Sequence, residues 1–253
     1  MQKKSSLLQH GLFWLLLLVL LVLRRPDQLF HAYVWDEDKN IMLQWFDLGV
    51  IKTFLAPING YLITISKLIN FSALHISFLY YPEVSTALSI LFDFLVLLMV
   101  AYSPNVLGWR KIAALSVVLI PASTEIQILP LYTFWFAGIL LLVSLLWQFK
   151  QESKTWYAVR IIMMLLGGAS SPLIVSLAPA FWLRLIYLRT IRETVIASIA
   201  TVFALIQGWF VYTQSSYSQP SKMPWYELLK LSYDQFFGKF FYILPVMPTR
   251  FIG

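Results

Sequence analysis

Long apolar runs alternate with short polar connections along the chain, a pattern typical of polytopic membrane proteins. The first run, Leu7–Leu23, consists mainly of leucine, valine, phenylalanine and tryptophan. At 1.5 Å per residue it extends roughly 25 Å, close to the bilayer core of about 30 Å. A cleaved signal peptide would end in small residues, but this run ends in Val22-Leu23 and continues into Arg24-Arg25-Pro26. We therefore predict an uncleaved first span.

Further apolar segments follow the first one. They are Glu83–Tyr102, Ile112–Ala122, Leu131–Phe149, two segments within Arg160–Leu188 that are separated near Gly167–Pro172, and Thr194–Thr213. Together they predict an all-α fold, a polytopic transmembrane helical bundle of about seven spans within residues 1–213. Residues 214–253 are expected to form an outward, polar and aromatic tail. The chain ends soon after the apolar residues 236–247, which suggests that it is truncated.

The first loop, residues 24–82, is too polar to lie in the hydrocarbon. Apolar residues recur at spacings of three and four between Ile41 and Gly49, which predicts a short amphipathic helix on the membrane surface. Pro57 and Asn59-Gly60 then break the chain. A second interfacial helix is expected over Tyr61–Phe71, with Leu62, Ile65, Leu68 and Ile69 on one side and Ser66 with Lys67 on another.

Composition supports the membrane class, because 59% of the residues are hydrophobic and only 12% are charged, against about 25% charged in soluble domains. The net charge of +7 is spread over short loops, so it does not indicate nucleic-acid binding. There is no cysteine, which excludes disulfides and thiolate metal sites.

The distribution of charge predicts the orientation in the membrane. With the amino terminus in the cytoplasm, the short inside segments hold only two acids, Glu152 and Glu193. Their basic residues are Lys3, Lys4, Arg110, Lys111, Lys150, Lys154, Arg160, Arg184, Arg189 and Arg192. Basic residues concentrate in the short cytoplasmic loops of membrane proteins. We therefore predict a multi-pass integral protein of the bacterial inner membrane, with its first loop facing outward.

Three adjacent acids, Asp36-Glu37-Asp38, are the most distinctive feature of that loop. Adjacent carboxylates are costly unless they face water, a cation or a proton donor, so the triplet is a general base, a cation ligand or simply a solvated turn. Its place between a span and an interfacial helix, beside Tyr33 and Trp35, favours a functional role at an external cleft.

These features resemble the GT-C superfamily of polytopic glycosyltransferases, which use polyprenyl-phosphate-linked sugars. Asp36-Glu37 matches the Asp-Glu form of the superfamily's first-loop motif, and Asp36-Glu37-Asp38 also satisfies Asp-x-Asp. The run Phe54–Leu62, with Pro57, Gly60 and Tyr61, resembles the P-x-x-G-Y-L run of bacterial members. Pro121–Glu125 is similar to their second outward loop. The resemblance covers roughly residues 7–190.

The resemblance implies transfer of a sugar, with inversion, from a polyprenyl-phosphate donor to a glycan or lipid acceptor on the outer face. A carboxylate must then reach the acceptor hydroxyl, and Asp36 is the first candidate, with Glu37 as the positioning group or alternative base. The candidate substrate-binding residues are Asp38, Lys52, Tyr61, Lys67 and Glu125. Lys67 and Lys52 are expected to face the leaving phosphate. No cofactor is certain, but Mg²⁺ or Mn²⁺ is compatible with the acids, and Asp38 or His31 would then be the ligand.

Two other functions fit the same sequence. A transporter or flippase for a lipid-linked glycan would use the intramembrane Asp93 as its coupling acid, although we find no internal repeat of the kind that transporters commonly show. An inactive partner subunit is the other alternative, since the chain is short for the superfamily that it resembles.

Overall fold

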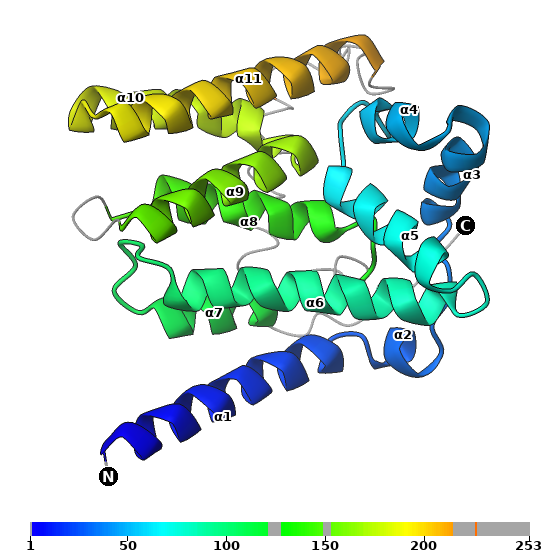
Figure 1. The fold of residues 1–253 in the computed structure, drawn as a ribbon, viewed down its shortest axis with the longest axis horizontal. Helices are drawn as coiled ribbons and strands as arrows, with labels where there is room; N and C mark the ends of the chain where they lie inside the picture. Colours follow the sequence, from blue (N-terminus) through cyan, green and yellow to red (C-terminus); the bar gives the residue numbers. More distant parts are fainter. Residues whose placement is uncertain (1, 121–127, 149–152, 215–225, 227–253) are drawn as a thin grey trace. The chain divides into compact units, whose positions relative to one another are not determined.

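A computed structural model describes residues 2–120, 128–148, 153–214 and 226, and side chains from residue 8 onward. Contacts divide the chain into Met1–Ser216 and Tyr217–Gly253; apart from Tyr226, the second unit lies outside the described residues. The described part is helical, without a strand. Its helices are α1 Gln2–Leu23, α2 Pro26–Phe30, α3 Asp38–Leu48, α4 Val50–Leu55, α5 Thr64–Ile76, α6 Tyr81–Tyr102, α7 Arg110–Leu119, α8 Thr133–Leu145, α9 Lys154–Ser170, α10 Leu173–Leu188 and α11 Ile191–Gln214 (Figure 1).

Two of these helices, α6 and α11, are long and apolar enough to cross a membrane. The 22 residues of α6 extend about 33 Å. Many helices also expose large apolar side chains, a liability in water that a lipid environment removes. They include Leu12 and Leu15 on α1, Leu91 and Leu95 on α6, Ile162 on α9, Leu183 and Ile186 on α10, and Val202 and Leu205 on α11.

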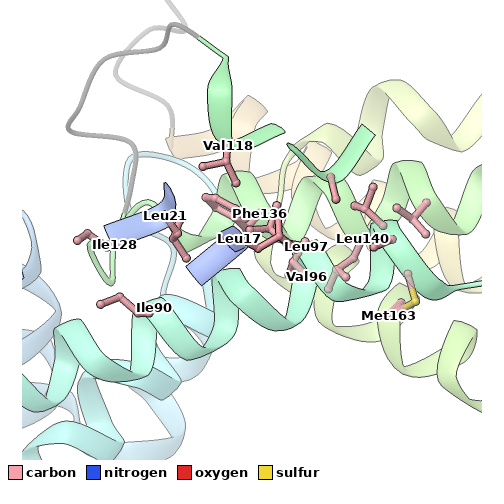
Figure 2. Close-up of a cluster of buried hydrophobic side chains, with 14 of the residues drawn as sticks. Leu17, Leu21, Ile90, Val96, Leu97, Val118, Ile128, Phe136, Leu140 and Met163 are labelled. Atoms are coloured by element: carbon pink, nitrogen blue, oxygen red, sulfur yellow. The ribbon is translucent and has the colours of Figure 1, made fainter. Parts of the chain in front are cut away.

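The main core lies where α1, α6, α7, α8 and α9 meet, and Figure 2 shows its side chains. Leu17 and Leu21 of α1 are fully buried against Leu97 of α6 and Val118 of α7. A second core, centred on Met164, packs α9 with α8, α10 and α11. In water, burial of such faces contributes about 25 cal/mol per Å² of apolar surface. Within lipid, close van der Waals packing is the source of stabilisation instead.

Close packing explains the glycine pair in α9. A Cβ atom at Gly167 would lie 2.8 Å from the Leu141 side chain of α8, and one at Gly168 would lie 2.6 Å from Phe203 of α11. Larger residues would force these helices apart. The predicted separation of two helices near this pair is confirmed, since α9 ends at Ser170 and α10 begins at Leu173.

The first loop folds into short helices at one end of the first unit, where α3, α4 and α5 lie (Figure 1). The rings of Trp45, Phe54 and Phe71 pack together and join these helices. The predicted break is a tight turn: Asn59 and Gly60 both have positive φ, and the backbones of Ile58 and Tyr61 form an isolated bridge. Asparagine and glycine tolerate that conformation best.

Several expected elements differ from the observed ones. Helix α5 begins at Thr64 and continues to Ile76, later than the predicted Tyr61–Phe71. Its orientation also differs: Ser66 and Lys67 are buried, whereas Leu68 is 45% exposed. The polar side is buried because α4 and the residues just before α8 supply hydrogen-bond partners.

Two of the predicted spans correspond to shorter helices. The run Ile112–Ala122 corresponds to α7, which has 10 residues, and Leu131–Phe149 to α8, which has 13. At 1.5 Å per residue they extend only about 15 and 20 Å. The figure of about seven spans therefore stays a prediction.

Candidate functional site

The acidic triplet lies at the start of α3, and its three side chains have three different environments. Asp36 is exposed and forms an ion pair with Lys39, one turn along the chain. Glu37 is half-buried, and Asp38 is buried with 1% of its surface exposed. Successive residues of a helical turn point about 100° apart, which explains why adjacent acids separate in this way. Only part of the triplet is therefore open to a substrate.

A polar network holds Asp38 inside the protein. Asn70 of α5 donates a hydrogen bond from Nδ2 to Asp38 Oδ1 at 3.0 Å, and the Tyr81 hydroxyl of α6 donates to the Asn70 side-chain oxygen. Asn70 Nδ2 also donates to the backbone oxygen of Ser66 at 2.8 Å. Asp38 Oδ2 has no hydrogen-bond partner among the described residues. The triplet is thus fixed to α5 and α6 through its third member.

The Asp38 carboxyl is therefore a perturbed group. Burial is the largest cause and raises its pKa from 3.8 to about 7. The charge of Glu37 raises the pKa further, whereas hydrogen bonds with the Asn70 side chain and the Leu131 backbone lower it. No cation of the described residues contacts this carboxyl, so burial is the dominant cause of the raised pKa. Groups with such pKa values concentrate at functional sites.

Aromatic and aliphatic side chains cover this network. The Trp35 ring packs against Tyr132 at a centroid distance of 6.1 Å, and Tyr61 packs against Phe134 at 5.5 Å. The other members of the cluster are Ile41, Ile58, Ile63 and Leu131. Tyr61, a predicted substrate-binding residue, is thus a half-buried part of the wall beside the acids.

Two buried polar residues fix the segment that leads into the triplet. Gln28 of α2 donates to the backbone oxygen of Tyr33 and to the Thr86 hydroxyl of α6, both at 3.0 Å. Arg25 donates to the Tyr33 hydroxyl, and its guanidinium lies 5.9 Å from the ring centroids of Tyr33 and Trp35. These contacts hold the acids at a defined position.

A polar groove of about 360 Å³ lies along α3, between this helix and the turn that follows α4. It is lined by Asn40, Leu43, Gln44, Asp47, Pro57, Ile58 and Asn59. Asn40 and Gln44 are four residues apart and share one face of α3. Asp36 precedes α3 and lies four residues before Asn40 in the sequence. Gln44 Oε1 is buried with no partner among the described residues.

The predicted phosphate-binding lysines differ from one another. Lys67 is fully buried and donates to the backbone oxygens of Thr53, at 2.5 Å, and Ala56. Burial lowers the pKa of this lysine to about 8. It therefore binds the carbonyls at the end of α4, and it does not project outward as expected. Lys52 is exposed on α4, and Glu125 lies outside the described residues.

The metal-site prediction concerned Asp38 and His31. Asp38 is buried, whereas His31 is exposed after α2. No group of three or more histidine, aspartate or glutamate side chains within the described ranges could hold a metal ion.

Some residues of this site were not identified from the sequence. Asn70 and Tyr81 hold Asp38, and Lys39 pairs with Asp36. The signal for Asn70 was present, since Ser66, Lys67 and Asn70 form a polar stripe at helical spacing on α5. Tyr81 gave no such signal, because an aromatic residue at the start of an apolar run is typical of the membrane interface.

No family model, curated protein or solved structure matches the chain. The resemblance to the GT-C superfamily accordingly depends on the short motifs described above.

Proposed function

We propose that this protein is a membrane glycosyltransferase of the GT-C type, which moves a sugar from a polyprenyl-phosphate donor to an acceptor hydroxyl at the outer face of the membrane. The observation that carries the proposal is the difference in exposure between Asp36 and Asp38, at the start of the helix that lines the polar groove. Asp38 anchors the turn from inside, while Asp36 stays exposed in the turn just before α3, whose Asn40 lines the groove. This combination gives a reactive carboxylate a rigid support.

The groove suits the acceptor. Its volume of about 360 Å³ is sufficient for one sugar ring, and the amides of Asn40, Gln44 and Asn59 can both donate to and accept from hydroxyl groups. A sugar hydroxyl, which also donates and accepts, is a suitable partner for these amides.

In the proposed reaction, the acceptor oxygen forms a bond to the anomeric carbon as the bond from that carbon to the phosphate oxygen breaks. The bonding electron pair leaves with the polyprenyl phosphate, and Asp36 takes the proton of the acceptor hydroxyl. One direct displacement inverts the anomeric centre. Glu37 is half-buried beside Asp36 and orients the acceptor or replaces Asp36 as base.

We propose that Lys39 and Lys52, and not the buried Lys67, balance the negative charge of the leaving phosphate. Lys39 is exposed and lies next to Asp36, and Lys52 is exposed on α4. An ion pair on the surface contributes only about 0–1 kcal/mol, so a phosphate can displace the Asp36 partner of Lys39. Displacement would also free the Asp36 carboxylate to act as base.

The orientation and the count of spans belong to the same proposal. The amino terminus of α1, the α6–α7 connection and the α10–α11 connection lie at the end of the first unit that is opposite to α3 (Figure 1). That end carries Arg110, Lys111, Arg189 and Arg192. This sidedness supports about seven crossings, with the basic end in the cytoplasm of a bacterial cell and the acids outside.

The test is an assay of the purified full chain in proteoliposomes with radiolabelled polyprenyl-phosphate sugars and candidate acceptors. Asp36→Asn should lower the rate by at least about 100-fold, the usual contribution of a general base. Glu83→Gln removes an exposed carboxylate from the first turn of α6 and should leave the rate unchanged. Full activity of Asp36→Asn would remove this residue from the mechanism, and a chain that transfers no sugar would end the proposal.

A second function, transport of a lipid-linked glycan, is favoured by one observation. Asp93 lies buried within α6; Ile128 donates its backbone N–H to Asp93 Oδ2 at 3.4 Å, and Oδ1 has no partner among the described residues. A buried acid within a span is a candidate coupling group. Lipid flux in proteoliposomes that survives Asp36→Asn but is lost in Asp93→Asn would establish this alternative.

A further inference from the structure

A pocket of about 560 Å³ lies between α1, the end of α6 and the start of α7. These segments are at the opposite end of the first unit from α3 (Figure 1). Its lining includes His10, Tyr102, Gly108, Trp109, Arg110 and Lys111. The proposed transfer reaction uses none of these residues.

The two cations of this pocket have no anionic partner in the described part of the chain. Arg110 donates from Nη1 to the backbone oxygen of Ser103 at 2.8 Å, and Lys111 Nζ lies 5.1 Å from the centroid of the Phe13 ring. The segments that build the pocket also lack acids, since neither residues 1–26 nor residues 94–124 contain aspartate or glutamate. Two adjacent cations that line a pocket without a carboxylate favour an anionic ligand.

A hydrogen-bonded trio adds a neutral donor. Trp14 Nε1 donates to the Tyr102 hydroxyl at 3.0 Å, and His10 Nδ1 lies 3.0 Å from the same oxygen. The arrangement that uses every hydrogen has the hydroxyl donate to Nδ1, which leaves the proton of neutral His10 on Nε2. The imidazole can then donate this proton to a ligand oxygen.

The surroundings identify a lipid as the source of the anion. Trp109 is 76% exposed at the mouth of the pocket, and Ile112, which also lines it, exposes about half of its surface. Exposed tryptophan next to arginine and lysine, at the end of apolar helices, is typical of the level of the lipid headgroups. We propose that this pocket binds the phosphate of an anionic membrane lipid, with Arg110, Lys111 and His10 as donors and Trp109 against the glycerol and upper acyl chains.

The proposal is tested by native mass spectrometry of the delipidated full chain titrated with phosphatidylglycerol or phosphatidylcholine. The unmodified protein should prefer phosphatidylglycerol by about 30-fold, the scale expected for two interfacial cations. Arg110→Gln with Lys111→Gln should abolish the preference. Lys154→Gln with Arg189→Gln removes the same charge from exposed positions and should preserve it.

A second pair of variants changes volume and leaves the charge and the Arg110 contact intact. A Cβ atom at Gly108 or Gly208 meets no atom within 4 Å, so both positions accept a larger side chain. Gly108→Leu, which fills part of the pocket, should weaken phosphatidylglycerol binding several-fold, whereas Gly208→Leu on α11 should not.

Three results would overturn the assignment. Equal loss in both double variants would indicate general surface charge. Unchanged binding in Gly108→Leu would show that the pocket is not the site. Complete competition by soluble glycerol phosphate at the concentration of the lipid would identify a soluble ligand.

Discussion

Two buried carboxylates of this protein, Glu193 and Asp38, have almost the same exposure, about 1%, but opposite surroundings. Both Glu193 oxygens accept hydrogen bonds from Arg160, at 2.7 and 2.9 Å, and both also accept from Arg184. Asp38 accepts one hydrogen bond from the neutral side chain of Asn70. The comparison shows that burial of an acid does not by itself indicate function. The two sites differ in whether arginines compensate the charge of the buried acid.

The Glu193 network has a structural explanation for each of its groups. The two arginines also donate to the backbone oxygens of Ser144, Leu145 and Trp147, at and just beyond the carboxyl end of α8. Carbonyls at a helix end lack partners within the helix and carry partial negative charge. The network therefore joins α8, α9, α10 and α11, and no group remains for a ligand.

The largest expected effect is the loss of one partner from this network. Arg160→Met leaves the buried Glu193 with a single arginine and should destabilise the protein by roughly 3–5 kcal/mol, as when other buried ion pairs are broken. The free energy of unfolding in detergent measures the change. Arg189→Met, at an exposed position, is the matched control and should have little effect. A similar small change in both variants would contradict the structural role of the network.

The second effect concerns Asp38 and depends on pH. The pKa of its carboxyl is 3.8 in ordinary surroundings and about 7 in the fold, so the folded state holds a proton that the unfolded state releases between these values. Stability from this group is therefore complete below pH 4 and falls as the pH rises through 7. The full loss is on the order of 4 kcal/mol. Asp38→Asn should remove it, because an amide does not ionise.

The measurement is the difference in unfolding free energy between Asp38→Asn and the unmodified protein, taken from pH 4 to pH 8. Subtraction cancels the other titrating groups that both chains share. The variant should gain relative stability from pH 4 to about 7 and show no further gain above that pH. A difference that is constant with pH would show that Asp38 is not an uncompensated buried acid.

The helices were largely predictable from the sequence, because apolar periodicity determines them locally. The carboxyl end of α6 and the separation of α9 from α10 followed from the apolar run and from the Gly167–Pro172 stretch. Helices α2 and α4 were not predicted. They have five and six residues, too few to give a periodic pattern, and isolated helices of that length are unstable without tertiary contacts.

The environments within the candidate site were not predictable in the same way. The sequence indicated that the three acids lie together, and the Asp-Glu and Asp-x-Asp motifs made each of them a candidate site residue. Which acid is buried depends on Asn70 and Tyr81, which come from α5 and α6 and lie 32 or more residues away from Asp38. Lys67 shows the same limit, since its partners are carbonyls of another helix, and carbonyls have no signature in a sequence.

Lys67 also gives the smallest of the expected effects, and it separates a structural cation from a functional one. Lys67→Met removes the donors to Thr53 and Ala56, so two carbonyls at the end of α4 lose their partner, at a cost of about 1–3 kcal/mol.

The lowered pKa of Lys67, about 8, adds a dependence on pH. The folded state releases this proton before the unfolded state does, so stability from this group rises between pH 8 and about 10.5. Lys67→Met should abolish that rise and lower the melting temperature, and in the proposed transfer reaction it should leave the KM for the donor unchanged. Lys52→Met, at an exposed lysine of the same region, should instead raise the KM with no change in melting temperature. The opposite pattern would restore Lys67 as the phosphate ligand that its sequence position suggests.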